Sequence, residues 1–172
     1  MAPRPGAAGA KSGDVSEPKV HRYVATCSWR GSTGGGYEAY DRGHDATSPP
    51  ADGTLALSSD PAFRGDPSRL NPEQLLVLAA ASCQLLSFLT VAARARVDVH
   101  AYDDIAEAVM PETDRYPWIT EIVLRPRITV APGPSEDRIR HLCEVAHREC
   151  YIANSVRTEI RIEPEITFAD GT

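Results

Sequence analysis

The sequence has little positive charge. It contains 18 Lys and Arg against 24 Asp and Glu, so its formal net charge is −6. No basic run interleaves with aromatic residues, which make up only 6% of the chain. A nucleic-acid-binding surface needs clustered cations that neutralise phosphates. The composition therefore argues against a nucleic-acid partner.

Two catalytic or nucleotide-binding motifs are also missing. The glycine-rich stretch Gly31–Gly36 is not followed by Gly-Lys-Ser or Gly-Lys-Thr, so it lacks the pattern of a phosphate-binding loop. Ser82 is not flanked by the glycines of a Gly-x-Ser-x-Gly turn, which makes a serine hydrolase an unfavourable interpretation.

No segment has the features expected of a membrane or secretory protein. The N-terminal residues lack the apolar core of a signal peptide. The most apolar segment, 71–96, is interrupted by polar side chains and closed by arginines, so we expect no membrane span. These observations predict a cytoplasmic protein. Its four cysteines are then expected to be reduced rather than to form a disulfide framework.

What the sequence does contain is one long apolar helix, from Asn71 to about Arg96. Asn71 is a favourable N-cap, Pro72 suits the first helical position, and Gln74 is placed to complete a capping box. The segment is apolar on nearly every side, which implies burial all round. One sheet face cannot cover such a helix, and a second copy of the chain is the simplest cover. We therefore expect a homodimer.

The remaining pattern predicts an α+β fold with a largely antiparallel sheet. Residues 1–18, rich in Ala, Gly and Pro, are predicted to be a disordered arm, followed by one domain over 19–172. Ser135 is predicted to cap a second helix that ends or bends near Cys150. Pro126 suggests an edge strand or a bulge. Alternating apolar residues predict strands in six segments, at 21–30, 37–45, 54–58, 100–110, 118–130 and 157–168.

The cysteines permit three kinds of chemistry. Cys83 and Cys150 lie on the two predicted helices, 67 positions apart. They could be inert core residues, or a thiolate and a second thiol that captures its oxidised form as a disulfide. Cys143, His147 and Cys150 share a helix face and, with another histidine, could bind zinc. Cys27, on a predicted strand, is interpreted as a packing residue.

Three segments together resemble the OsmC/Ohr family of thiol-dependent peroxidases, over roughly residues 20 to 168. They are Asn71-Pro72-Glu73-Gln74-Leu75-Leu76, Ala81-Ser82-Cys83 and Ala146-His147-Arg148-Glu149-Cys150. The resemblance implies an intertwined homodimer with the long helices central and a sheet on each outer side. It also implies reduction of organic hydroperoxides without a metal or organic cofactor, followed by regeneration by a thiol or dithiol reductant.

Residue by residue, the resemblance makes Cys83 the peroxidatic cysteine and Cys150 the resolving one. Glu73 resembles the carboxylate that orients a catalytic arginine, although it could simply complement the helix dipole. Arg42 is our choice for that arginine. Its rivals are Arg30 and Arg64.

Glu73 and Cys83 are ten residues apart on one predicted helix, hence ~15 Å apart along its axis. Either the helix breaks, or each site takes Glu73 and Arg42 from one chain and the two cysteines from the other. We expect the second arrangement.

The sequence departs from better-studied family members at two places. Gln84 follows Cys83 where an aromatic residue is usual, and Tyr-Ile-Ala-Asn follows Cys150 where those members have Pro and a small residue. A second function is therefore kept open: a non-catalytic dimer that binds a small apolar ligand in the same pocket.

Overall fold

The computed structural model describes residues 18–113 and 116–169. The predicted arm, residues 1–18, lies outside this range except for Pro18. Within the described residues the elements follow in chain order, with two short 3-10 turns, η1 (Pro61–Phe63) and η2 (Ala153–Ser155). The helices are α1 (Pro72–Arg94) and α2 (Glu136–Glu149), and the strands are β1 (Thr26–Ser28), β2 (His44–Thr47), β3 (Leu55–Leu57), β4 (Val99–Val109), β5 (Glu121–Val130), β6 (Glu159–Ile162) and β7 (Glu165–Phe168).

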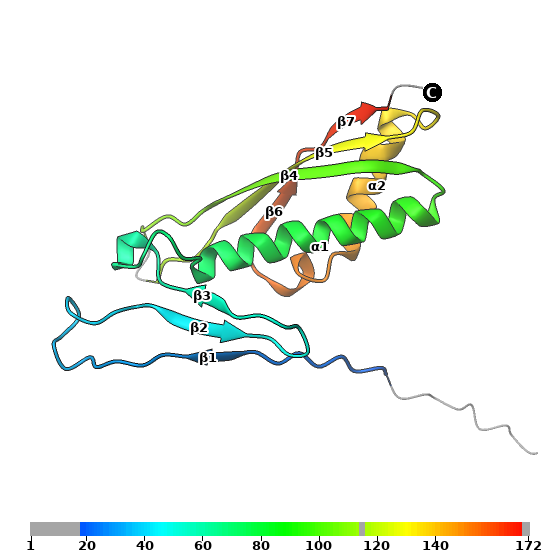
Figure 1. Ribbon diagram of the computed structural model, residues 1–172. Coiled ribbons are helices and arrows are strands. Elements are labelled where there is room, and N and C mark those ends of the chain that lie inside the picture. Colours follow the sequence, from blue (N-terminus) through cyan, green and yellow to red (C-terminus); the bar gives the residue numbers. More distant parts are fainter. Residues whose placement is uncertain (1–17, 114–115, 170–172) are drawn as a thin grey trace, which may run out of the picture.

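The strands form two separate sheets. Strands β1, β2 and β3 pair antiparallel in chain order, and this small sheet stands apart from the rest of the chain (Figure 1). In the second sheet β4 pairs antiparallel with β5, while β6 and β7 run parallel to β5 on its other side. The predicted α+β class and the mostly antiparallel pairing are confirmed.

Helix α1 begins as the sequence predicts. The Asn71 side chain accepts a hydrogen bond from the Gln74 backbone N–H over 2.8 Å, and the Gln74 side chain accepts one from the Asn71 N–H over 3.0 Å. This reciprocal pair satisfies two backbone donors that have no partner within the helix. The helix continues unbroken to Arg94.

Helix α2 is also capped as predicted. The Ser135 hydroxyl accepts a hydrogen bond from the Arg138 N–H. The helix ends at Glu149, and Cys150 is its C-cap, with an extended backbone conformation. Its apolar stripe packs with α1 against one face of the four-stranded sheet. The buried residues of this cluster include Phe88, Val91 and Ala92 of α1, Ile128 and Val130 of β5, and Ile139, Leu142 and Ala146 of α2.

The opposite face of the four-stranded sheet is polar and carries cross-strand ion pairs. Arg125 pairs with both Glu107 and Glu163, and Arg127 pairs with Glu165. One face of the sheet is therefore charged and the other is covered by helices. Apolar surface that remains uncovered lies mainly on α1.

Two predictions about the last strands are wrong. The segment 157–168 is two strands, β6 and β7, separated at Glu163 and Pro164. Pro126 is buried within β5, which has partners on both sides and is neither an edge nor a bulge. The reason lies in the strand pairing: β6 pairs with β5 up to Leu124, and β7 pairs with it from Arg127 onward. Pro126, which lacks an N–H, therefore lies opposite the interruption.

The small sheet is shorter than predicted. The segment 21–30 is a strand only at Thr26–Ser28, and 37–45 joins the sheet only from His44. Tyr23 is 90% exposed, so one chain gives these residues no apolar surface to pack on. Cys27 is exposed rather than packed in the protomer, which contradicts its predicted role.

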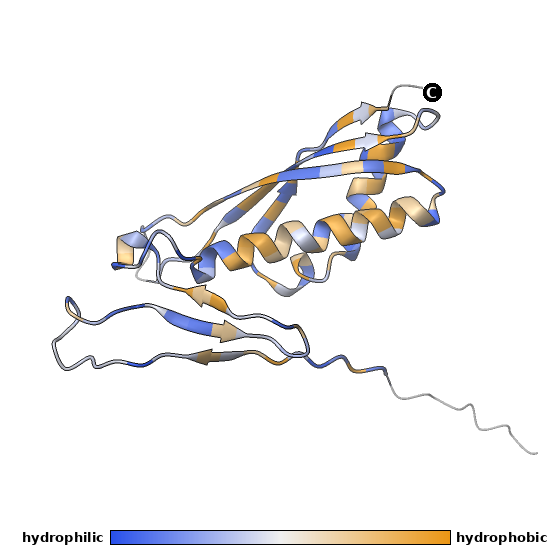
Figure 2. Cartoon of the chain, viewed as in Figure 1, coloured by the Kyte–Doolittle hydropathy of each residue, from blue (hydrophilic) through white to orange (hydrophobic). Residues whose placement is uncertain are grey.

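Figure 2 shows that α1 is apolar along most of its length. It is long and apolar enough to cross a membrane, contrary to our expectation, although core helices of soluble proteins meet the same criteria. Only 28% of its most apolar window is buried within one chain. The uncovered residues include Leu78, Leu86 and Leu89. The protomer therefore leaves one apolar face of α1 open.

Candidate active site

Cys83 lies in the middle of α1, on the wall of an open groove of about 810 Å³ between α1 and the end of α2. Its side chain is half-buried. The groove is also lined by Leu86, Thr90 and Arg94 of α1 and, from the other side, by Arg148, Tyr151 and Ile152. A small molecule in this groove has direct access to the Cys83 sulfur.

Cys150 lies beside Cys83 although 67 positions separate them in the sequence. The two thiols are close enough to interact, since the Cys83 side chain raises the pKa of Cys150, and the Ile152 N–H donates to the Cys83 sulfur over 3.5 Å. Cys150 is only 2% exposed. Burial raises its pKa to about 11, and the interaction with Cys83 adds to that rise, while the Ala153 N–H opposes it. The pair thus combines an accessible thiol with a buried, protonated one.

Two half-buried polar side chains, Asp104 and Tyr102, lie on the core side of β4. Burial raises the pKa of Asp104, and the Arg125 backbone N–H only partly offsets this. Burial also raises the pKa of Tyr102, with Asp104, Cys143 and Cys150 as smaller contributors. Among the described residues the Tyr102 hydroxyl has no hydrogen-bond partner.

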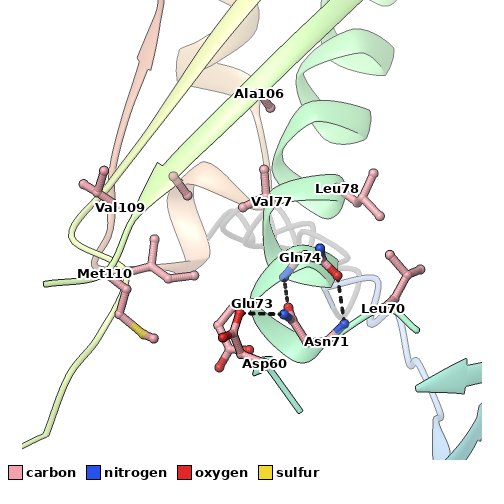
Figure 3. A pocket seen from close by; sticks show the side chains of 12 residues that line it. Asp60, Leu70, Asn71, Glu73, Gln74, Val77, Leu78, Ala106, Val109 and Met110 are labelled. Carbon is pink, nitrogen blue, oxygen red and sulfur yellow. Dashed lines mark hydrogen bonds between the residues drawn. The ribbon is translucent and has the colours of Figure 1, made fainter. Parts of the chain in front are cut away.

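Glu73 lies at the other end of α1, in a different pocket of about 490 Å³. Figure 3 shows its carboxylate next to Asp60 and Asn71, with Val77 and Met110 on the walls. Within the described part of the chain Glu73 has no hydrogen bond or ion pair. Because α1 is continuous, Glu73 and Cys83 remain ~15 Å apart along the helix axis. One protomer does not bring them together.

None of the three candidate arginines contacts Glu73 or the Cys83 groove in the protomer. The Arg42 guanidinium lies 3.7 Å from the centre of the Tyr40 ring and donates to the Tyr37 and Tyr40 carbonyls. Arg64 pairs with Glu38. Arg30 donates to the Ser28 hydroxyl and the Trp29 carbonyl. Arg42 does line a pocket that includes Pro72, so it lies toward the same end of α1 as Glu73.

Two cations that our sequence interpretation missed lie in the Cys83 groove. Arg94 and Arg148 both line it, and Arg94 is 3.7 Å from Glu149. Arg94 follows Cys83 by eleven residues, which is three helical turns, so helical spacing alone could have placed it on the same stripe. Arg148 precedes Cys150 by two residues.

The zinc alternative has no geometric support in residues 18–113 and 116–169, where no cluster of three or more His, Cys, Asp or Glu side chains could hold a metal ion. Burial raises the Cys143 pKa to about 12 and lowers the pKa of His147. Cys143 belongs to the apolar core.

Comparison with known proteins identifies the fold and the family. The chain is similar to three solved structures. An OsmC-like protein of unknown function from Vibrio cholerae has 26% identity and a TM-score of 0.76, covering 85% of this chain and 100% of that one. An organic hydroperoxide resistance protein from Legionella pneumophila has 16% identity and a TM-score of 0.66, covering 87% and 99%. One from Elizabethkingia anophelis has 18% identity and a TM-score of 0.65, covering 88% and 99%.

No curated protein matches the chain. The two hydroperoxide resistance proteins are too distant to support more than the shared fold. The family model described as OsmC-like protein matches residues 65–165, which span α1, both cysteines of the pair and β4 to β6. The chain therefore belongs to the family of OsmC-like proteins.

Proposed function

We propose that this protein is a thiol-dependent peroxidase that reduces organic hydroperoxides through Cys83 and Cys150. The observation that carries the proposal is the contact between the two thiols, one accessible from an open groove and one 2% exposed behind it. A peroxidatic thiol must meet the oxidant, and a resolving thiol must meet the oxidised sulfur. The two positions suit these two roles.

The reaction would begin at the Cys83 sulfur. The Cys83 thiolate attacks one peroxide oxygen, the O–O bond breaks, and the other oxygen leaves as an alkoxide that takes a proton to give the alcohol. Cys83 is then a sulfenic acid. Cys150 attacks its sulfur, forms the Cys83–Cys150 disulfide and releases water. An external thiol or dithiol reduces this disulfide and returns both cysteines to the starting state.

The complete site would need two chains. We propose a homodimer in which the open face of α1, with Leu78, Leu86 and Leu89, packs against the partner. Glu73 and Arg42 of one protomer would then complete the groove of Cys83 in the other. Two observations support this arrangement: the unbroken α1 separates Glu73 from Cys83, and Glu73 has no partner in the described part of its own chain. A guanidinium next to Cys83 would favour its ionised form.

The substrate would be a small organic hydroperoxide, and neither nucleic acid nor membrane takes part. The setting we propose is the reducing cytoplasm, as the sequence predicts.

The test is a titration of the purified protein with cumene hydroperoxide, with free thiols counted and the peptides identified by mass. We expect one equivalent to join Cys83 to Cys150. The Cys83→Ser variant should consume no peroxide, and the Cys150→Ser variant should stop at a Cys83 sulfenic acid that dimedone traps. Thiols that stay reduced would reject the peroxidase and favour the non-catalytic ligand-binding dimer.

A further inference from the structure

The turn that follows α2 supplies backbone donors to both sulfurs of the cysteine pair. The Ile152 N–H donates to the Cys83 sulfur over 3.5 Å. The Ala153 N–H, and to a smaller degree the Ile152 N–H, acts on the Cys150 sulfur. Two consecutive peptide groups therefore face the two thiols. A hydrogen bond donated to sulfur favours the charged thiolate over the neutral thiol.

Asn154 holds this turn in place. Its side-chain amide donates to the Cys150 carbonyl over 2.9 Å and to the Arg148 carbonyl over 3.0 Å. Its backbone N–H also donates to the Cys150 carbonyl, over 3.1 Å. Arg148 and the C-cap residue Cys150 stand at the C-terminal end of α2, where carbonyls lack partners within the helix. One side chain thus ties the helix end to the segment that carries Ile152.

We propose that Asn154 is a positioning residue, which fixes the turn so that the Ile152 N–H points at the Cys83 sulfur and stabilises its thiolate. The proposal rests on the proposed function only in taking Cys83 as the reacting thiol. It gives Cys83 a source of activation within its own chain, separate from an arginine of a second protomer.

Ser155 provides a matched control. Its hydroxyl donates to the Tyr151 carbonyl over 2.6 Å, so it also forms a side-chain to backbone hydrogen bond within the same turn. Within the described part of the chain, neither the Ser155 hydroxyl nor the Tyr151 carbonyl forms a hydrogen bond with a sulfur. The charged groups that share the Cys83 groove are Arg94, Arg148 and Glu149, and their side chains make no hydrogen bond with the Asn154 side chain. Substituting Asn154 or Ser155 therefore changes no charge there.

The experiment measures the rate at which iodoacetamide alkylates Cys83, from pH 6 to pH 9, in a Cys27→Ser background with peptides identified by mass. We expect Asn154→Ala to slow alkylation at pH 7 by about tenfold, as loss of a hydrogen bond to a charged group predicts. The ratio of the two rates should shrink as the pH rises. Ser155→Ala should stay within about twofold of the parent throughout.

Amide hydrogen exchange at Ile152 is measured on the same samples and should accelerate in Asn154→Ala. Because Asn154→Ala could unfold the turn completely, Asn154→Ser is included: its hydroxyl can keep one of the two carbonyl contacts, and we expect an intermediate rate. The proposal would be overturned if an Asn154 variant exchanged its Ile152 amide faster than the parent and yet its Cys83 were alkylated at the parental rate. No peroxide is used, so a protein that shows these rates yet reduces no hydroperoxide would reject only the proposed function.

Discussion

The Gln84 side-chain amide donates to the Cys143 main-chain carbonyl over 3.3 Å, across the buried interface between α1 and α2. Gln84 is 1% exposed and adjoins Cys83, while Cys143 precedes Cys150 by about two helical turns. The bond limits sliding of one helix along the other. It thereby helps to keep the two thiols in register.

Asp104 should make stability depend on pH. Burial raises its pKa in the folded state above the ordinary value of about 3.9, so the folded chain binds the proton more tightly than the unfolded one. Stability therefore falls as the pH rises from about 4 through the folded pKa. We expect Asp104→Asn to remove this contribution to the slope and to be more stable than the parent at pH 7. Urea unfolding between pH 4 and pH 8 measures it.

The neighbouring Asp103→Asn is the control for that experiment, because Asp103 is exposed on the same strand. It should keep the parental slope. If Asp104→Asn kept the parental slope too, burial would not perturb this carboxyl.

The thiols should react with alkylating agents in a fixed order. The pKa of about 11 keeps Cys150 protonated at pH 7.5, and its burial blocks access. Cys143, with a pKa of about 12, is buried in the core. In a Cys27→Ser background, limiting iodoacetamide should label Cys83 first and label Cys143 only after denaturation. Peptide masses over time measure the order, and Cys150 labelled ahead of Cys83 would contradict it.

Subunit mixing tests whether Glu73 and Cys83 serve one site from two chains. Glu73→Gln and Cys83→Ser should each be inactive alone. Refolded together in equal amounts, half of the dimers are mixed, and each holds one complete site, so about a quarter of the parental peroxidase activity should return.

Mixing Cys83→Ser with Cys150→Ser is the matched control. Both cysteines of a site come from one chain, so no complete site forms and turnover should stay absent. If the Glu73→Gln mixture also stayed inactive, the shared site would be rejected.

A charge on the open face of α1 should separate the protomers. Leu86 is 62% exposed in the single chain, so Leu86→Glu should change folding stability by no more than about 0.5 kcal/mol. It would place a carboxylate in the proposed interface, and we expect a monomer by size exclusion with light scattering. Ile105→Glu, at a 72% exposed position on the polar sheet face, should stay dimeric. A dimeric Leu86→Glu protein would put the interface elsewhere.

Much of the fold could be predicted because local signals and tertiary packing agree. The capping box at Asn71 and Gln74 sets the start of α1, and Ser135 sets the start of α2. The position of Pro126 could not be predicted, because it depends on a break between β6 and β7 that forms 38 residues later in the chain. The length of β1 also escaped prediction, since alternation alone does not supply a surface to pack on.

The candidate site divides in the same way. Family resemblance indicated Cys83 and Cys150, whose side chains interact in the structure, whereas their spacing alone left inert core residues open as well. The Ile152 N–H donor and the Asn154 side-chain hydrogen bonds depend on the conformation of a backbone turn. A turn of this kind has no periodic sequence pattern from which it could be predicted. The choice among Arg42, Arg30 and Arg64 stays a prediction, because each of them lies outside the Cys83 groove of its own protomer.

Helix α1 runs from Pro72 to Arg94 without a kink. A rigid rod of this kind offers no hinge that could close the distance between its two ends. A site that requires both Glu73 and Cys83 would then form only when two chains associate. The activity of such an enzyme would depend on its own concentration, and dilution that dissociates the dimer would abolish it.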